Sequence, residues 1–138
     1  MFSGASAGAH GLAAPRILLV DDDRDLLVPL ADQLRHDGFD VTTARDGEEA
    51  LRRLDTAWPD LLIIDLLMPR MDGYELAGRL REEAPGKSPF LVAVSGCVSP
   101  EEHRRSAAAG IDLHLDKPAE PAVLVGVLRR FARGLAPA

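Results

Sequence analysis

Short apolar runs alternate with longer stretches of helical spacing along this chain. The apolar runs, which we predict to be strands, cover residues 17–20, 41–44, 61–64, 90–94 and 111–115. Four of the five are nearly continuous in apolar residues, as parallel strands covered on both faces are, whereas Thr42 and Thr43 mark the second run as an edge strand. The alternation predicts five strand–helix pairs in an α/β domain.

The predicted helices carry start signals of their own. Asp23 follows the first strand as a helix-capping residue. Three further starts are capping boxes, in which an oxygen-bearing residue is followed three positions later by glutamate. These boxes are Asp46 with Glu49, Asp72 with Glu75, and Ser99 with Glu102. They predict where the helices begin as well as which segments are helical.

Apolar stripes predict which helix faces pack on the sheet. One stripe consists of Leu26, Leu27, Leu30 and Leu34, and another of Val123, Leu124, Val127, Leu128 and Phe131. The fourth helix differs, because residues 104–109 offer only alanines as apolar groups before Gly110 ends the helix. We therefore expect the fourth helix to be weakly anchored and able to move.

Length and composition narrow the class of protein. The chain has 138 residues, which predicts one domain at about 150 residues per domain. Ten of the first fourteen residues are Gly, Ala or Ser, so we expect a flexible leader at 1–15, a domain over 16–134 and a short tail at 135–138. The longest apolar runs fall far below the ~20 residues that a membrane helix needs.

The charge balance and the single cysteine limit the partners and the compartment. The 22 acidic residues against 16 basic ones give a formal net charge of −6, which leaves no basic footprint for direct binding of nucleic acid. Cys97 is the only cysteine and forms neither an internal disulfide nor a thiolate zinc site. Because the N-terminus also lacks a secretory signal, we expect a cytoplasmic protein with no membrane partner.

Polar residues stand where four of the predicted strands stop. They are Asp21, Asp22 and Asp23 after the first strand, Asp65 after the third, Ser95 after the fourth and Lys117 after the fifth. In an open parallel sheet the carboxyl ends of the strands share one edge, and ligands bind there at the point where the strand order reverses. We therefore expect these side chains to converge in one crevice.

Such a group of side chains suits a cation and a phosphoryl group. Asp21, Asp22 and Asp65 would crowd three carboxylates, whose repulsion requires a proton or a cation. Their hard oxygens favour Mg²⁺ over zinc. Lys117 and Ser95 suit a phosphoryl group, and Asp65 can attack phosphorus as a nucleophile to form an acyl phosphate. Taken alone, Asp21 to Asp23 also fit a helix cap with surface acids, but Asp65 follows four apolar residues, a costly place for a carboxylate that binds nothing.

Three stretches together resemble the receiver domains of bacterial two-component response regulators. They are residues 17–23 (ILLVDDD), 64–73 (IDLLMPRMDG) and 112–118 (DLHLDKP), and the resemblance extends over about 15–134. It implies a flavodoxin-like, doubly wound parallel sheet of five strands in the order 2-1-3-4-5 with five helices. It also implies that the protein is no enzyme with a separate substrate, but catalyses only its own phosphorylation and dephosphorylation.

The resemblance implies roles around the phosphoryl group. Asp65 is expected to be the phosphoacceptor, with a histidine kinase or a histidine phosphotransfer protein as donor. Lys117 would pair with a phosphate oxygen. Ser95 occupies the switch position, where a hydroxyl swings toward the phosphate, and Gly96 beside it leaves space for the donor.

The resemblance also implies how the metal is held. Asp22 and Asp65 would bind Mg²⁺ through their side chains, the backbone carbonyl of Leu67 would be a third ligand, and Asp21 would support the ion through water. These residues account for the oxygen-rich pattern at the ends of the first and third strands.

Three positions depart from the family pattern or modify it. His114 stands at the second switch position, where the family usually has Tyr or Phe, which implies altered coupling to the fourth helix and fifth strand. Leu67 and Cys97 occupy positions that modulate hydrolysis of the acyl phosphate in the family. Because apolar groups there do not orient an attacking water, we hypothesise a long-lived phosphoryl state.

Two other functions stay open at this point. The chain can be a receiver-shaped interaction module that works without phosphate, or a phosphatase or phosphotransferase with a nucleophilic aspartate. The enzyme is disfavoured because Leu67 holds the place of its second acid/base carboxylate. For a receiver, we expect a downstream protein target to bind the face of the fourth helix, fifth strand and fifth helix, and the same face is open to homodimerisation.

Overall fold

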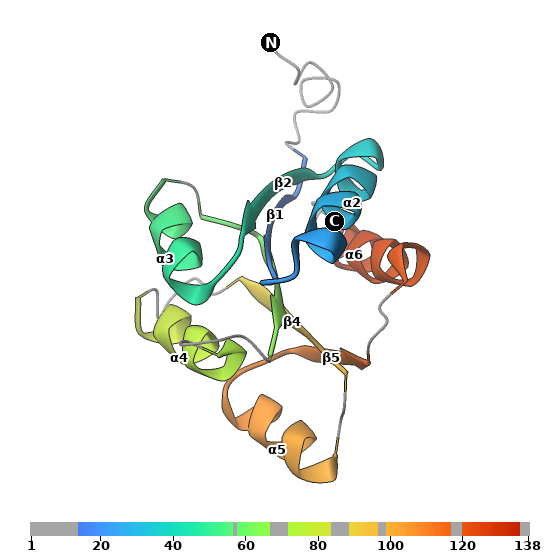
Figure 1. The fold of residues 1–138 in the computed structure, drawn as a ribbon. Coiled ribbons are helices and arrows are strands. Elements are labelled where there is room, and N and C mark those ends of the chain that lie inside the picture. The colour runs from blue at the N-terminus through green and yellow to red at the C-terminus, as the bar shows by residue number, and fades with distance from the viewer. Residues whose placement is uncertain are drawn as a thin grey trace.

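The structure of the protein is a computed structural model that describes residues 14–56, 58–66, 72–83, 89–96, 99–116 and 120–135. Within these residues strands and helices alternate in five pairs (Figure 1). The strands are β1 (Arg16–Val20), β2 (Asp40–Ala44), β3 (Leu61–Asp65), β4 (Phe90–Ser95) and β5 (Leu113–Asp116). The helices are α2 (Arg24–His36), α3 (Gly47–Thr56), α4 (Gly73–Glu83), α5 (Pro100–Ala108) and α6 (Pro121–Leu135). The domain boundaries at 15 and 134 stay a prediction.

The five strands form one parallel sheet in the order β2-β1-β3-β4-β5. This is the flavodoxin-like, doubly wound order, and it confirms the predicted fold class. The crossover helices cover both faces, with α2 and α6 on one face and α3, α4 and α5 on the other (Figure 1). β2 lies at an edge of the sheet, as Thr42 and Thr43 predict, and both threonines are half-buried.

Each face of the sheet carries its own buried apolar cluster. Successive side chains of a strand point to opposite faces, so a continuous apolar run supplies both clusters. In β1, Leu18 and Val20 pack with α3 and α4, whereas Ile17 and Leu19 pack with α2 and α6. The near-continuous runs in the sequence are therefore explained by a sheet with two covered faces.

The predicted stripe of α2 is correct except at its first position. Leu27 and Leu34 are buried together with Ala31, and Leu30 is half-buried. Leu26 is 51% exposed, so the prediction that it packs on the sheet is wrong. At 3.6 residues per turn Leu26 lies about 100° around the helix from Leu27, which places it on the flank.

The predicted stripe of α6 is wrong at Val123 for the same geometric reason. Val123 is 56% exposed, whereas Leu124, Val125 and Leu128 are buried. Val125 was absent from the predicted stripe. The side chain of Phe131 lies outside the described residues. The face of α6 that packs on the sheet is therefore rotated toward Val125.

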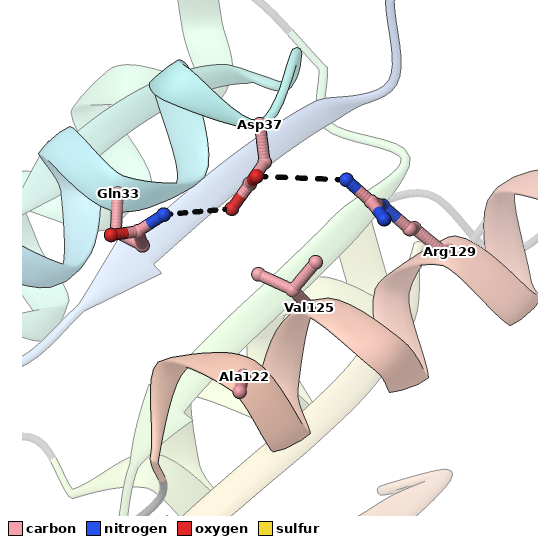
Figure 2. A pocket seen from close by; sticks show the side chains of 5 residues that line it. All are labelled: Gln33, Asp37, Ala122, Val125 and Arg129. Carbon is pink, nitrogen blue, oxygen red and sulfur yellow. Dashed lines mark hydrogen bonds and ion pairs between the residues drawn. The ribbon is translucent and has the colours of Figure 1, made fainter.

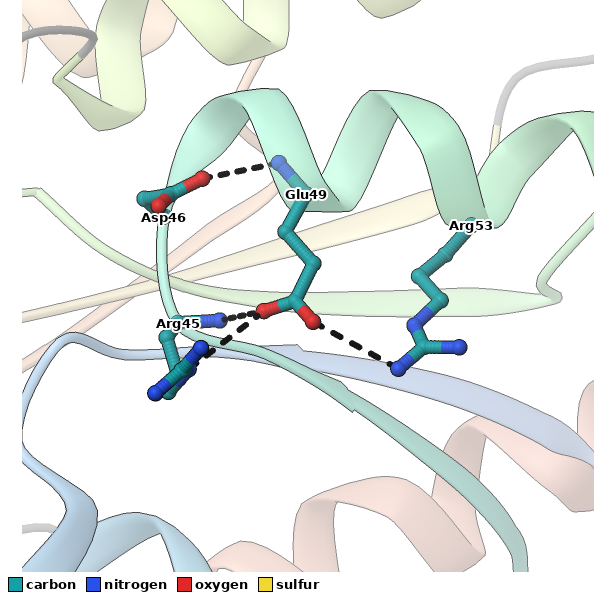
Figure 3. A network of polar contacts seen from close by, with 4 residues as sticks. All are labelled: Arg45, Asp46, Glu49 and Arg53. Carbon is teal, nitrogen blue, oxygen red and sulfur yellow. Dashed lines mark hydrogen bonds and ion pairs between the residues drawn. The ribbon is translucent and has the colours of Figure 1, made fainter.

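The helix starts follow the predicted capping boxes. Each capping oxygen accepts a hydrogen bond from the backbone N–H of the expected glutamate, at 2.8 Å for Asp46 and Glu49, 2.9 Å for Asp72 and Glu75, and 3.1 Å for Ser99 and Glu102. Figure 3 shows the start of α3, where the Glu49 carboxylate also accepts from the Arg45 N–H at 2.7 Å and lies 3.4 Å from the Arg53 guanidinium. A single glutamate thus ties the end of β2 to two turns of α3.

β5 begins two residues later than predicted, because the end of α5 uses the intervening backbone. The Gly110 N–H donates to the Ala107 carbonyl, and the Ile111 N–H donates to the Ser106 carbonyl. With Gly110 at φ +86°, these two bonds form a Schellman motif. Ile111 therefore closes the helix instead of starting the strand, and its buried side chain packs with α3 and α4.

Candidate functional site

The sheet register gathers the predicted site residues at one edge. Val20 is paired with Ile64, so Asp21 and Asp65 follow paired positions of β1 and β3. Asp65 is paired with Val94, which places Ser95 one residue further along β4. β1 and β3 flank the point where the strand order reverses, since β2 lies on one side of β1 and β3 on the other. Ligands bind at this kind of position in open α/β sheets.

Three carboxylates meet at this edge. Asp21, Asp22 and Asp65 each offer an oxygen, and these oxygens all lie within 4.8 Å of one another. Asp65 is 6% exposed, Asp21 is half-buried and Asp22 is exposed. Such crowding of negative charge is stabilised by a cation, so the acidic cluster can hold a metal ion. Three hard oxygen donors beside an open rim fit Mg²⁺, which keeps several of its waters.

Backbone hydrogen bonds fix the acidic cluster in place. The Asp21 N–H donates to the Ala44 carbonyl at 3.1 Å, which ties the end of β1 to the end of β2. The Asp21 carboxylate accepts from the Asp23 N–H at 2.9 Å, and the Asp23 carboxylate caps α2 by accepting from the Asp25 N–H at 3.0 Å. The helix-cap interpretation therefore applies to Asp23, whereas Asp21 and Asp22 face Asp65.

Ser95 lies beside the cluster at the end of β4. Its side chain is fully buried, and its strand neighbour Val94 is the residue paired with Asp65. A Cβ atom added at Gly96 would meet nothing within 4 Å among the described residues. Gly96 itself is exposed, and the expected space for a donor beside it stays a prediction.

Three predicted site residues, Leu67, Lys117 and Cys97, lie outside the described residues. β5 ends at Asp116, which is paired with Ser95, so the chain reaches the same edge one residue before Lys117. The structure thus brings together Asp21, Asp22, Asp65 and the buried Ser95. The predicted roles of Lys117, of the Leu67 carbonyl and of Cys97 stay predictions.

His114, at the second switch position, contacts α5. Its Nδ1 lies 3.0 Å from Ser106 Oγ, and its ring centroid lies 4.9 Å from that of His103. Burial lowers the pKa of His114, and the neighbouring His103 lowers it further, whereas Asp116 and Glu102 act in the opposite direction. His103 is exposed, and the sequence gives no signal of its contact with His114.

A second set of polar contacts links α5 to the start of α4. Arg105 lies 3.7 Å from the Asp72 carboxylate that caps α4, and its guanidinium lies 4.1 Å from the centroid of the Tyr74 ring. Arg81 of α4 donates to the carbonyl of Gly110 and pairs with Asp112. Neither contact was predicted, because helical spacing does not reveal which side chains face each other across two helices.

A hollow lies between α2 and α6. Figure 2 shows its lining, in which Asp37 accepts from Gln33 at 3.0 Å and pairs with Arg129 at 3.5 Å, above Ala122 and Val125. Asp37 ends α2, whereas the acidic cluster precedes the start of that helix. The lining residues all come from these two helices and their ends, and none of them belongs to the acidic cluster.

The fold and the site together define a class. A doubly wound parallel sheet of five strands, with a carboxylate cluster at its switch point and a buried hydroxyl beside it, is a flavodoxin-like α/β domain built to bind a ligand at its carboxyl edge. The chain belongs to the response regulator receiver domain family, whose model matches residues 17–129. It is thus a receiver domain of the two-component signalling type. None of the described helices combines the length and the apolar character needed to cross a bilayer.

Comparisons with known proteins agree with this family. The chain is 35% identical over 91% of its length to an uncharacterized 14.6 kDa protein of Leptolyngbya boryana, of which it covers 96%. It is 37% identical over 89% of its length to the transcriptional regulatory protein PrrA of Mycobacterium leprae, but spans only 52% of that protein. The chemotaxis protein CheY4 of Vibrio cholerae has a similar structure, with a TM-score of 0.81 and 32% identity over 86% of this chain and 98% of that one.

Proposed function

We propose that Asp65 accepts a phosphoryl group from a phosphohistidine donor, with Mg²⁺ bound at the acidic cluster. The single observation that supports this most is the geometry of the cluster: a nearly buried carboxylate at the end of β3 lies within 4.8 Å of two further carboxylates. Carboxylates crowded in this way favour a bound cation, because the cation reduces their mutual repulsion.

The residues present suggest how the ion is held. Asp22 and Asp65 would bind Mg²⁺ directly, the Leu67 carbonyl would complete the protein ligands, and Asp21 would act through water, since its carboxylate already accepts from the Asp23 N–H. When bound, the ion would neutralise negative charge on the phosphoryl oxygens during transfer. The acidic chemistry of the site, with oxygen donors only, supports Mg²⁺ over softer metals.

Phosphoryl transfer requires one nucleophile from the protein and groups that stabilise the charge on the phosphoryl oxygens. A carboxylate oxygen of Asp65 attacks phosphorus, the P–O bond forms as the P–N bond to the donor imidazole breaks, and the imidazole leaves with the electron pair of that bond. Lys117 would pair with a phosphoryl oxygen and offset its charge. The Ser95 hydroxyl, on the strand beside Asp65, would donate to another phosphoryl oxygen. Hydrolysis of the acyl phosphate restores Asp65, so the chain acts only on itself.

The same proposal includes the partners. The donor would be a histidine kinase or a histidine phosphotransfer protein, which would approach over the exposed Gly96. A downstream protein would bind the face of α5, β5 and α6, where α5 is the element that responds to the phosphoryl group. These are protein partners, and a cytoplasmic location with no direct contact to nucleic acid or membrane is part of the proposal.

Phosphorylation in vitro tests the proposed function. The purified protein is incubated with acetyl phosphate, with and without Mg²⁺, and its intact mass is measured over time. We expect the mass of one phosphoryl group to be added only with Mg²⁺ in the wild type and not at all in Asp65→Asn. Asp55→Asn, which removes an exposed carboxylate on α3, is the matched control and should be phosphorylated like the wild type.

The outcomes separate the three candidate functions. A wild type that gains no mass with Mg²⁺ contradicts the proposal and supports an interaction module that works without phosphate. Release of inorganic phosphate over many turnovers supports an enzyme instead. The lifetime of the adduct tests the hypothesis of a long-lived phosphoryl state, because a lifetime of seconds would contradict it.

A further inference from the structure

Helix α5 is attached to the domain mainly through polar side chains. Ser106 is its one buried residue, and the other described positions of the helix are exposed or half-buried. By contrast, α4 buries Leu76, Ala77 and Leu80 against the same face of the sheet. The position of α5 therefore depends on a small number of polar contacts.

Three of these polar residues meet between α5 and β5, and we call them the histidine junction: His103, Ser106 and His114. Residues 103 and 106 are three positions apart and so share one face of the helix. Ser106 Oγ lies 3.0 Å from His114 Nδ1, and the rings of His103 and His114 lie 4.9 Å apart at an interplanar angle of 49°. His114 of β5 thus contacts two side chains of α5.

His114 has a setting that suits only its neutral form. Its neighbours Leu113 and Leu115 pack on the other face of the sheet with α2 and α6, so its ring points toward α5. The Nε2 atom is buried and has no hydrogen-bond partner among the described residues. In the tautomer whose Nδ1–H donates to Ser106 Oγ, neutral His114 carries no proton on Nε2, and a proton added there would be a buried donor without an acceptor among the described residues, which is costly.

Charged groups around the junction come from two elements. α5 contributes His103 and Glu102, and β5 contributes Asp116, whereas the β4 residue paired with His114 is Ala93. Arg105, next to Ser106, is engaged on the α4 side with Asp72 and Tyr74. Burial and then His103 lower the pKa of His114, whereas Asp116 and Glu102 act in the opposite direction.

We propose that the histidine junction is a proton-sensitive fastening, which holds α5 against β5 while His114 is neutral and releases it when His114 is protonated. The proposal needs neither Mg²⁺ nor a phosphoryl group, so it goes beyond the proposed function and is tested separately. Mild acid and the phosphorylation of Asp65 would then act on the same helix.

The direction of the pH effect follows from the protons bound in each state. Burial, and then His103, lower the pKa of His114. The state in which α5 is held against β5 therefore binds fewer protons than the state in which α5 is released. The fastening is at full strength above the ordinary histidine pKa of about 6.5, and it weakens as the pH falls from there through the lowered pKa. One proton changes the equilibrium by at most about tenfold per pH unit.

Hydrogen exchange on the full, unphosphorylated chain tests the fastening. The amides of residues 100–108 are followed by mass spectrometry at pH 7.5 and pH 5.5, with the rates corrected for intrinsic exchange. In the wild type we expect protection of α5 to fall by up to about tenfold, while that of α6 changes less.

Variants assign the effect to the junction. His114→Phe keeps a ring of similar size without a titrating group, and the protection of α5 should be the same at both pH values. His103→Gln should reduce the loss, because it removes a neighbour that lowers the pKa of His114. His36→Gln, at the exposed end of α2, is the matched control and should behave like the wild type.

Two outcomes overturn the proposal. One is equal protection of α5 in the wild type at both pH values. The other is a loss in His114→Phe as large as in the wild type. Should His114→Phe fail to fold, His103→Gln decides alone, and a loss equal to that of the wild type overturns the fastening.

Discussion

Helices α5 and α6 flank the last strands of the sheet, yet different forces hold them. α6 buries Leu124, Val125 and Leu128 against its face of the sheet, whereas α5 buries Ser106. A fully buried Leu or Val contributes roughly 1.5–3 kcal/mol, whereas an exposed ion pair contributes at most about 1 kcal/mol. Apolar burial thus fixes α6 in one place, while α5 can shift at a small free-energy cost.

The contacts of α5 also lead back to the acidic cluster. Asp72 caps α4, and the Gly73 N–H that follows donates to the carbonyl of Leu66, directly after Asp65. Arg105 of α5 pairs with the same Asp72. A displacement of Leu66 therefore reaches α5 through one carboxylate. The weakly held helix is thus connected to the site.

The largest effect should come from truncating the apolar anchor of α6. Leu128 is fully buried, and Leu128→Ala removes its contacts and leaves a cavity, so we expect a loss of about 2–5 kcal/mol in the free energy of unfolding. Urea denaturation measures this loss. The exposed Val123 on the same helix gives the control, and Val123→Ala should cost no more than about 0.5 kcal/mol. Equal losses in the two variants would contradict the anchoring role of Leu128.

The next effect concerns the glycines that end α5 and α2. Gly110 and Gly38 both have positive φ, at +86° and +98°, so alanine at either site should cost about 1–2 kcal/mol in backbone strain. A Cβ at Gly110 would also lie 2.7 Å from Arg81 Nε, whereas one at Gly38 meets nothing within 4 Å. Gly110→Ala should therefore displace Arg81 from the Gly110 carbonyl and cost more than Gly38→Ala in urea denaturation. A larger cost at Gly38 would show that Arg81 contributes nothing to holding α5.

A smaller effect should follow from removing the cap of α5. Ser99→Ala deletes the acceptor for the Glu102 N–H and should cost about 1 kcal/mol. Because little apolar burial holds α5, we expect the loss to appear as faster exchange of residues 100–108 alone. Asp46→Ala removes the matching cap of α3, which buries Ala50 and Leu54. In Asp46→Ala the loss should appear as a lower global stability. Faster exchange confined to α3, as large as that of α5 in Ser99→Ala, would contradict the difference between the two helices.

The smallest effect should come from the link between α5 and α4. The side chains of Arg105 and Asp72 are 62% and 40% exposed, so Arg105→Gln should lower global stability by less than about 1 kcal/mol. The exchange of α5 amides should nevertheless rise, since the contact with Tyr74 is lost as well. Arg104→Gln changes an exposed neighbour and should leave exchange as in the wild type. Equal exchange rates of the α5 amides in both variants would show that Arg105 does not help to hold α5 against α4.

The sequence predicts the sheet well, because apolar runs report burial on both faces. All five strands lie where the runs are, and the edge position of β2 follows from its two threonines. Helix faces are predicted less well. Leu26 and Val123 belong to apolar clusters in the sequence but lie on helix flanks, since a run of adjacent leucines or valines does not state which residue faces the sheet.

The candidate site also has one part that the sequence predicts and one part that it does not. That Asp21, Asp22 and Asp65 come together follows from topology alone, because parallel strands end at one edge. The contacts of α5 with His114, Asp72 and Tyr74 depend on how far the helix lies from its neighbours and how it is rotated about its axis. Hydrophobic periodicity carries no signal for that rotation when the helix has few apolar residues.

The parallel winding of the chain has one more electrostatic consequence. Each helix runs back against the strand before it, so α2 to α6 all begin at the rim that holds the carboxylates (Figure 1). A helix start carries a partial positive charge of about half a unit from its unpaired amide groups. The rim that concentrates three acids is therefore also ringed by amide dipoles of opposite sign, an arrangement ready to receive an anion of high charge.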